Sequence, residues 1–101
     1  MGKYRDAARD QECTLQIHPY CLNTTETTCL NHLNCEDKGM SNKSPDWWGV
    51  DGCHNCHAII DGRMPVKDIS PMEIEACKWR GLYRTFKRRI AMGLITIKGV
   101  S

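Results

Sequence analysis

The sequence contains no apolar run that approaches the roughly 20 residues needed to span a bilayer, which sets membrane roles aside. The N-terminal stretch MGKYRDAARDQEC lacks the apolar core of a secretory signal peptide and carries charges throughout its first twelve residues. Seven cysteines would suit a disulfide scaffold in a secreted protein, but without a signal peptide we expect reduced thiols and a cytoplasmic location. The 101 residues, without internal repeats or low-complexity tracts, predict one domain that gains from a metal staple.

Four of the cysteines form two pairs, Cys13-x7-Cys21 and Cys53-x2-Cys56. Zinc takes four tetrahedral ligands in structural sites, commonly all thiolate, so we expect these four side chains to bind one structural Zn²⁺. A site with three cysteines and His18 is the alternative. The three remaining thiols are expected to be small buried apolar groups: Cys29, Cys35 and Cys77.

Local patterns predict the order of the secondary structure. Ser70 as N-cap, Pro71 at the first helical position and Glu73 three residues after the cap predict the start of a long helix that Gly93 closes. Threonine-rich residues 24–33 favour a strand because β-branched side chains suit strands. The other expected elements are a helix or arm over 1–12, a polar loop over 35–46, a strand over 47–52, a helix over 56–61 and a strand over 94–99.

Positive charge is concentrated at the C-terminal end. Residues 1–70 carry seven Lys/Arg against ten Asp/Glu, net −3, whereas residues 71–101 carry seven against two, net +5. Within the long helix the apolar residues are spaced as an amphipathic stripe that should pack against the core: Trp79, Leu82, Tyr83, Phe86 and Ile90. The basic face could neutralise phosphates, and the alternative is an ordinary solvated helix surface.

A strand that ends at His32, a loop, a second strand, a CxxCH run and a short helix follow one another along the chain. This order resembles the ββα-metal, or His-Me finger, nucleases of the HNH type. CxxCH alone also marks c-type haem attachment, but here it joins an upstream cysteine pair and a strand histidine. Nearly the whole chain is similar to the YbcO family of small prophage-encoded nucleases, through RDAARDQEC, Cys13-x7-Cys21, ETTCLNHL, PDWWGVDGC and CHNCHAIID.

The resemblance implies an α+β fold in one nuclease domain over 1–101. Its parts would be a basic arm at 1–12, a zinc-stapled, treble-clef-like ββα-metal core at 13–62 and a basic amphipathic helix at 70–93. His32 would be the general base, since an imidazole with a pKa of about 6.5 can accept a proton from water near neutral pH. The Asp46 carboxylate would orient the His32 ring by accepting a hydrogen bond from His32 Nδ1. Asn42 and Asp51 are rivals for that role.

His57 and Asp61 are four residues apart, so on a helix they lie on one face and can hold one ion. One imidazole and one carboxylate suit a catalytic divalent cation, and the hard oxygen ligand favours Mg²⁺ or Mn²⁺ over zinc. Asn31 occupies the position where HNH-type enzymes often place a further ligand. Its amide oxygen is a poorer ligand, and neighbouring strand residues point to opposite faces unless a bulge intervenes.

These expectations describe a metal-dependent DNA endonuclease in a bacterial host cell, acting in phage or prophage DNA processing or recombination. Backbone contacts carry affinity without sequence information, so we expect a weakly specific or structure-selective enzyme. One alternative is a non-catalytic zinc-knuckle module that binds nucleic acid, and another is an adaptor that forms homodimers through its last helix. The expected phosphate contacts are Arg5, Arg9, Lys43, Arg63, Arg84, Lys87 and Arg88.

Overall fold

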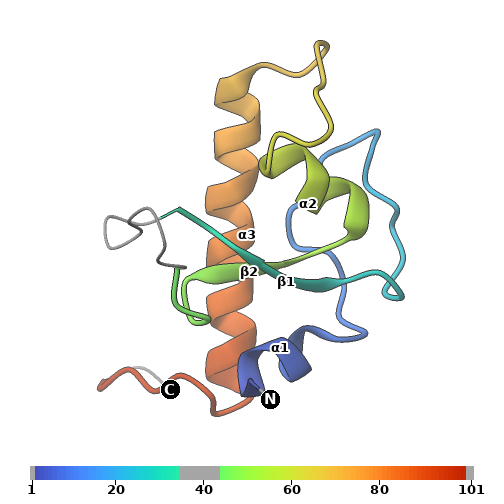
Figure 1. The fold of residues 1–101 in the computed structure, drawn as a ribbon. Helices are drawn as coiled ribbons and strands as arrows, with labels where there is room; N and C mark the ends of the chain where they lie inside the picture. The colour runs from blue at the N-terminus through green and yellow to red at the C-terminus, as the bar shows by residue number, and fades with distance from the viewer. Residues whose placement is uncertain (1, 35–43, 100–101) are drawn as a thin grey trace.

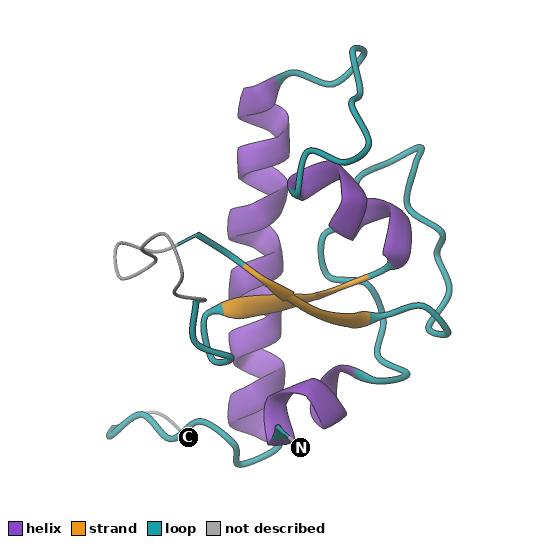
Figure 2. Cartoon of the chain, viewed as in Figure 1, coloured by secondary structure: helices purple, strands orange, loops and turns teal. Residues whose placement is uncertain are grey.

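The computed structural model describes residues 2–34 and 44–99, and it shows a small mixed α/β fold in which a long helix runs behind a short sheet (Figures 1 and 2). Within these residues the order of elements agrees with the predicted one, up to the last helix. The elements are α1 (Lys3–Ala8), β1 (Cys29–His32), β2 (Gly49–Gly52), α2 (His54–Ile60) and α3 (Pro71–Ala91).

The sheet is a single antiparallel pair. Cys29 lies opposite Gly52 and His32 opposite Gly49, so both strands are shorter than the predicted ranges because their pairing lasts for only four residues. Side chains alternate along a strand. Asn31 is accordingly fully buried, whereas its neighbour His32 keeps part of its side chain in solvent.

The ends of α3 are those that the sequence predicts. The Ser70 side chain accepts a hydrogen bond from the backbone N–H of Glu73 at 3.2 Å, and Pro71 occupies the first helical position. At the other end Gly93 has a φ of 78°, a left-handed conformation that favours glycine. Its N–H donates to Ile90 O, and the next N–H donates to Arg89 O, which is the Schellman arrangement.

The predicted strand over 94–99 is wrong. The backbone N–H groups of Leu94 and Ile95 both donate to Arg89 O at the end of α3, and Leu94 O accepts a bond from the Tyr4 hydroxyl at 3.1 Å. The N–H groups of Leu94 and Ile95 and the carbonyl of Leu94 therefore bond to the end of α3 and to α1 rather than to a strand. No partner strand lies beside this segment in the described residues. The Tyr4 bond thus joins α1 to the segment that follows α3, and both lie at the same end of that helix (Figure 1).

The face that α3 turns toward the core differs from the predicted stripe. Leu82 is buried, but Trp79 and Tyr83 are 65% and 66% exposed. A Cβ atom on Gly81 would lie 3.0 Å from the Leu15 side chain, so a glycine lets the helix approach the Cys13–Cys21 loop closely. The buried face of the helix instead contains Gly81, Leu82, Thr85 and Arg89.

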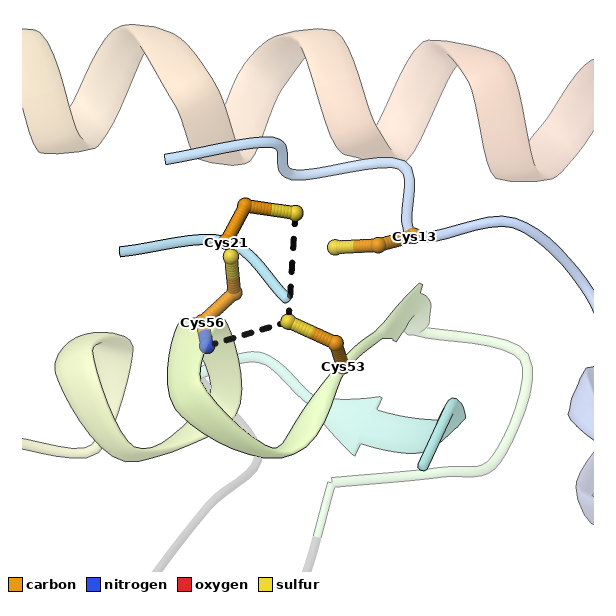
Figure 3. Close-up of side chains that lie close together, drawn as sticks. All are labelled: Cys13, Cys21, Cys53 and Cys56. Carbon is orange, nitrogen blue, oxygen red and sulfur yellow. Dashed lines mark hydrogen bonds between the residues drawn. The ribbon is translucent and has the colours of Figure 1, made fainter. Parts of the chain in front are cut away.

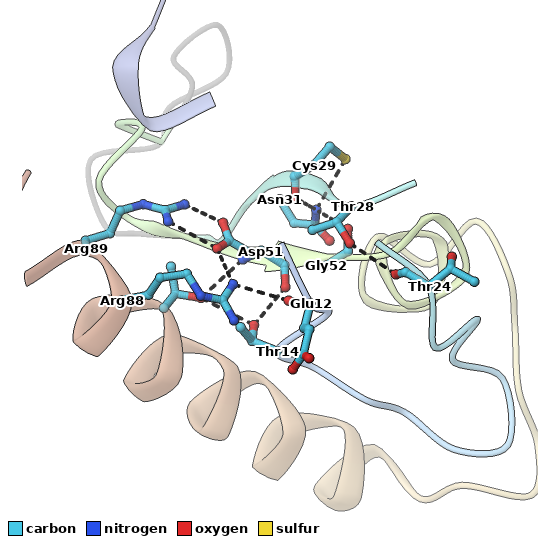
Figure 4. Close-up of polar contacts among 11 residues, drawn as sticks. Glu12, Thr14, Thr24, Thr28, Cys29, Asn31, Asp51, Gly52, Arg88 and Arg89 are labelled. Carbon is cyan, nitrogen blue, oxygen red and sulfur yellow. Dashed lines mark hydrogen bonds and ion pairs between the residues drawn. The ribbon is translucent and has the colours of Figure 1, made fainter. Parts of the chain in front are cut away.

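A buried polar network joins α3 to β2. Asp51 is fully buried and accepts hydrogen bonds from both guanidinium ends of Arg89 and, at 2.7 Å, from Arg88 Nη1. The Thr85 hydroxyl accepts the backbone N–H of Asp51 at 3.1 Å. Figure 4 shows Arg88 and Arg89 directed at Asp51. A charge buried at this depth is tolerated only when it is paired and hydrogen-bonded, so this network fixes the helix on the sheet.

The apolar core surrounds the paired cysteines and is filled chiefly by Leu15, Ile17, Val50, Ile59 and Leu82. No helix within the described part of the chain combines the length and the apolar character that crossing a membrane requires.

Candidate metal centre and active site

The four paired cysteines converge on one point. Their sulfur atoms all lie within 4.8 Å of one another, and the Sγ atoms of Cys21 and Cys53 are 3.9 Å apart (Figure 3). Four thiolates at the tetrahedral zinc–sulfur distance of about 2.3 Å lie about 3.8 Å from one another, so the cluster fits the ion. His18 is exposed and is not part of the cluster. The four side chains could hold a metal such as zinc.

Backbone donors surround these sulfur atoms. The N–H of Ile17 donates to Cys56 Sγ at 3.4 Å, and the N–H of Gln16 points at Cys13 Sγ at 3.5 Å. Donors of this kind favour thiolates over thiols. The hydrogen bond with Cys56 lowers the pKa of Cys13 to about 4, and the same bond raises the pKa of Cys56. Burial raises the pKa of Cys21 to about 11, and a bound cation would favour the ionised form of these sulfurs.

The other cysteines differ from the expectation of burial. Cys29 is exposed and its Sγ lies 3.8 Å from His57 Nδ1, and Cys77 is half-buried. Cys35 lies outside the described residues.

The cysteine cluster also positions α2. Cys53 is its N-cap residue, and its sulfur accepts the N–H of Cys56 at 3.4 Å. The helix ends at Ile60, with Asp61 as C-cap and Gly62 at a φ of 80°. Gly62 thus allows the turn that holds the Asp61 carboxylate one helical turn beyond His57.

His57 and Asp61 form a pair whose Nε2 and Oδ2 atoms are 3.0 Å apart. Arg63 Nη2 lies 3.3 Å from the same carboxylate oxygen. Burial lowers the pKa of His57, and the positive charge of Arg63 lowers it further, although Asp61 opposes both effects. The lowered pKa favours the neutral His57 ring, which is the form that binds metal ions.

His32 and Asp46 form a second pair. The distance from His32 Nε2 to Asp46 Oδ1 is 2.8 Å, so the contact uses Nε2 rather than the predicted Nδ1. Arg5 Nε lies 3.7 Å from the other oxygen of Asp46, which brings the N-terminal arm to this pair. The rival Asp51 is occupied by Arg88 and Arg89, and the rival Asn42 lies outside the described residues.

One cavity of about 150 Å³ is lined by one residue of each pair. It is lined by His32 from β1 and Asp61 from the end of α2, together with Leu33, Asn34, Ile60 and Lys78. His32 is also close enough to His57 for its charge to lower the pKa of that ring. An imidazole, a carboxylate and a lysine side chain thus border one small space.

Asn31 is placed elsewhere. It is fully buried, its Nδ2 donates to Cys29 O at 2.7 Å and to Gly52 O at 3.4 Å, and it does not line the cavity (Figure 4). Its Oδ1 has no hydrogen-bond partner among the described residues. A side chain on Gly52 would collide with this oxygen, so the glycine makes room for the amide.

The predicted phosphate contacts lie in different settings. Arg5, Arg9 and Lys87 are exposed, with the Lys87 ammonium over the Tyr83 ring, and Arg63 lies beside Asp61. Arg84 donates to Gln16 Oε1 at 3.1 Å, and Arg88 is held by Asp51 and by Glu12 O. Lys43 lies outside the described residues.

Lys78 is the cavity residue that sequence reasoning missed as a site residue. It is one of several cations on α3, and only its place in the fold, beside Leu33 and Asn34, distinguishes it. Its ammonium is 3.0 Å from Glu75 and its side chain is 25% exposed. No local motif marks this position.

The geometry can be compared with known proteins. The model of the family described as "Putative nuclease YbcO" matches residues 2–94. A solved structure described as that of a putative bacteriophage protein from Escherichia coli str. K-12 substr. MG1655 is 28% identical, covers 90% of this chain and 100% of its own, and has a TM-score of 0.73. A comparison with curated proteins finds no match. Because the family model spans nearly the whole sequence, the chain belongs to the YbcO family.

Proposed function

We propose that this protein is a metal-dependent DNA endonuclease of the HNH, or His-Me finger, type, with β1, β2 and α2 as its ββα-metal core. The observation that carries the proposal is the cavity that His32 and Asp61 line together. The family described as a nuclease and the similar bacteriophage protein support the same reaction class and a role in phage or prophage DNA processing.

His32 is the general base in this proposal. Asp46 accepts the proton of Nε2, which leaves the lone pair of Nδ1 to accept a proton from water. The water oxygen then bonds to phosphorus as its proton passes to Nδ1. The bond from phosphorus to the 3′ oxygen breaks, and that oxygen gains a proton from solvent. Lys78, at the edge of the cavity, can stabilise the charge on the phosphoryl oxygens.

His57 and Asp61 are the residues that would hold the catalytic ion, and the neutral His57 ring and the carboxylate suit Mg²⁺ or Mn²⁺. When bound, such an ion stabilises negative charge on the phosphate and on the departing oxygen. Asn31 has no part in this set because its side chain is buried away from the cavity. Cys13, Cys21, Cys53 and Cys56 would hold a structural metal, which we propose is zinc, and this would fix the start of α2, the helix that carries His57 and leads to Asp61.

Cleavage of DNA tests the proposal. Supercoiled, single-stranded and branched DNA would be incubated with the protein and Mg²⁺ or Mn²⁺, and the His32→Ala variant would be compared with the wild type. We expect metal-dependent cleavage that this substitution slows by about 10²-fold to 10⁴-fold. His54→Ala is the matched control, because His54 is an exposed imidazole on α2 and lies outside the cavity. Equal cleavage by wild type and His32→Ala would contradict the assignment.

A non-catalytic zinc-knuckle module that binds nucleic acid is the second candidate. The burial of Asn31 favours it, because only two protein ligands then remain for a catalytic ion. DNA binding without cleavage, in the wild type and in His32→Ala alike, would establish this alternative.

A further inference from the structure

Trp79 is a large apolar side chain that the fold leaves in solvent. It is 65% exposed, although its place in the sequence predicts packing. A single exposed aromatic residue needs no explanation, but one that lines a cavity does. Trp79 borders a cavity of about 220 Å³, which we call the tryptophan pocket; its other lining residues are Leu33, Asn34, Trp48, Glu75, Lys78 and Leu82.

The walls of the tryptophan pocket are held in place. Trp48 Nε1 donates to Asn34 O at 2.9 Å, and the Trp48 ring makes an edge contact with Phe86, with centroids 6.3 Å apart. Leu82 is buried and belongs to the core. Trp79 lies within α3, away from both ends of the helix. The pocket is therefore formed before any ligand arrives, which lowers the entropy cost of binding.

The tryptophan pocket adjoins the cavity that His32 and Asp61 line. Leu33, Asn34 and Lys78 border both spaces. Lys78 thus stands between an apolar, aromatic chamber and the polar chamber that contains the candidate base. A nucleotide has the same two parts, since its flat apolar base and its charged phosphate are joined through one sugar.

We propose that the tryptophan pocket receives one unstacked DNA base next to the scissile phosphate, so that the enzyme prefers single-stranded or branched DNA to intact duplex. This inference rests on the nuclease function proposed above and names its substrate class. Aromatic side chains stack on any base, because every base has a π face. Bases in a duplex are already stacked and paired, so their entry carries an additional energetic cost. Glu75 pairs with Lys78 and can accept a bond from a base amino group.

Binding measurements in the His32→Ala background test this proposal without relying on cleavage. The probes are a single-stranded oligonucleotide and a blunt duplex of the same sequence, and the variant is Trp79→Ala. We expect this substitution to weaken single-strand binding by about 5-fold to 150-fold and to leave duplex binding unchanged. Tyr83→Ala is the matched control, because Tyr83 lies one turn further along α3, is 66% exposed and does not line the pocket. It should change neither affinity.

The pocket assignment would be overturned if Trp79→Ala weakened the binding of both probes equally, if it weakened the binding of neither, or if Tyr83→Ala had the same effect as Trp79→Ala. A concentration-dependent dimer that Trp79→Ala abolishes, with no change in single-strand affinity, would assign the pocket to a second copy of the chain and also overturn the proposal. If any of these results were found and the wild type still cleaved DNA in a manner that depends on His32, the pocket proposal would fail and the nuclease proposal would stand. Selective loss of single-strand binding in a protein that cleaves nothing would support the pocket and end the nuclease proposal.

Discussion

Asp46 and Asp51 are carboxylates five residues apart, and their surroundings give them different tasks. The Asp46 side chain is 33% exposed and contacts His32, whereas Asp51 is fully buried and contacts Arg88 and Arg89. The sequence offered both as partners of the candidate base. It could not separate them, because the choice depends on how the loop before β2 folds and on a buried ion pair with a helix some 40 residues away.

The Asp51→Asn variant should lose about 3 to 5 kcal/mol of stability, because the buried Arg89 guanidinium would keep its charge and lose its counter-ion. The free energy of unfolding in urea measures this effect. Asp46→Asn is the control and should change stability by less than about 1 kcal/mol, since its ion pairs are partly exposed. Equal losses of unfolding free energy in the two variants would show that the buried Asp51 ion pairs stabilise the fold no more than the partly exposed Asp46 pairs do.

The Asp46→Asn variant should lower kcat for DNA cleavage by about 10-fold to 100-fold while KM changes little, because an amide holds the His32 ring less firmly than a carboxylate does. Steady-state cleavage rates at several DNA concentrations give the two parameters. A change confined to KM would instead assign Asp46 to substrate binding.

At the scale of elements, local signals were enough for some boundaries. Ser70, Pro71 and Gly93 marked the ends of α3, because caps and left-handed glycines act within one turn. The strand expected over 94–99 failed because a strand needs a partner, which periodicity does not reveal. The exposed Trp79 was missed for a similar reason, since the buried face of α3 is set by its contacts with Asp51 and Leu15.

We expect metal binding by the four-cysteine cluster to stabilise the position of α2 in the fold. We expect one zinc per chain, loss of that zinc in Cys53→Ser and a lower melting temperature in that variant. Serine remains a good N-cap, so the loss would report the missing ligand rather than the cap. Elemental analysis and thermal unfolding measure the two effects, and acidification should also release the metal because protons compete for thiolates.

Cys77→Ser is the control for this experiment, because Cys77 is half-buried and lies outside the cluster. It should retain the zinc. A Cys53→Ser protein with normal zinc content would exclude the four-cysteine site.

At the scale of the whole molecule, the net charge of residues 71–101 overstates how much of α3 is free to meet DNA. Arg89 and Arg88 neutralise Asp51, and Arg80 donates to backbone oxygens of the Cys13–Cys21 loop. Charge counts along a sequence cannot distinguish cations that hold the fold from those that face solvent. Exposed cations include Lys3 and Arg5 on α1, Arg63 after α2 and Lys87 on α3.

DNA affinity should fall with rising salt, and Arg9→Ala or Lys87→Ala should each reduce the slope of log K against log salt by about one. These two side chains are exposed and lie outside the cavity. Fluorescence anisotropy with duplex DNA over a range of salt concentrations measures the slope. An unchanged slope in both variants would remove α1 and the outer side of α3 from the DNA interface.

The central claim is that His32 and the pair of His57 and Asp61 act on one phosphate. Crystals soaked in Mn²⁺ and measured for anomalous scattering test it most directly. We predict a manganese peak within coordination distance of His57 and Asp61, at the edge of the cavity that His32 lines. No peak there at a manganese concentration that supports cleavage, or a single peak on the far side of the molecule from His32, would contradict it.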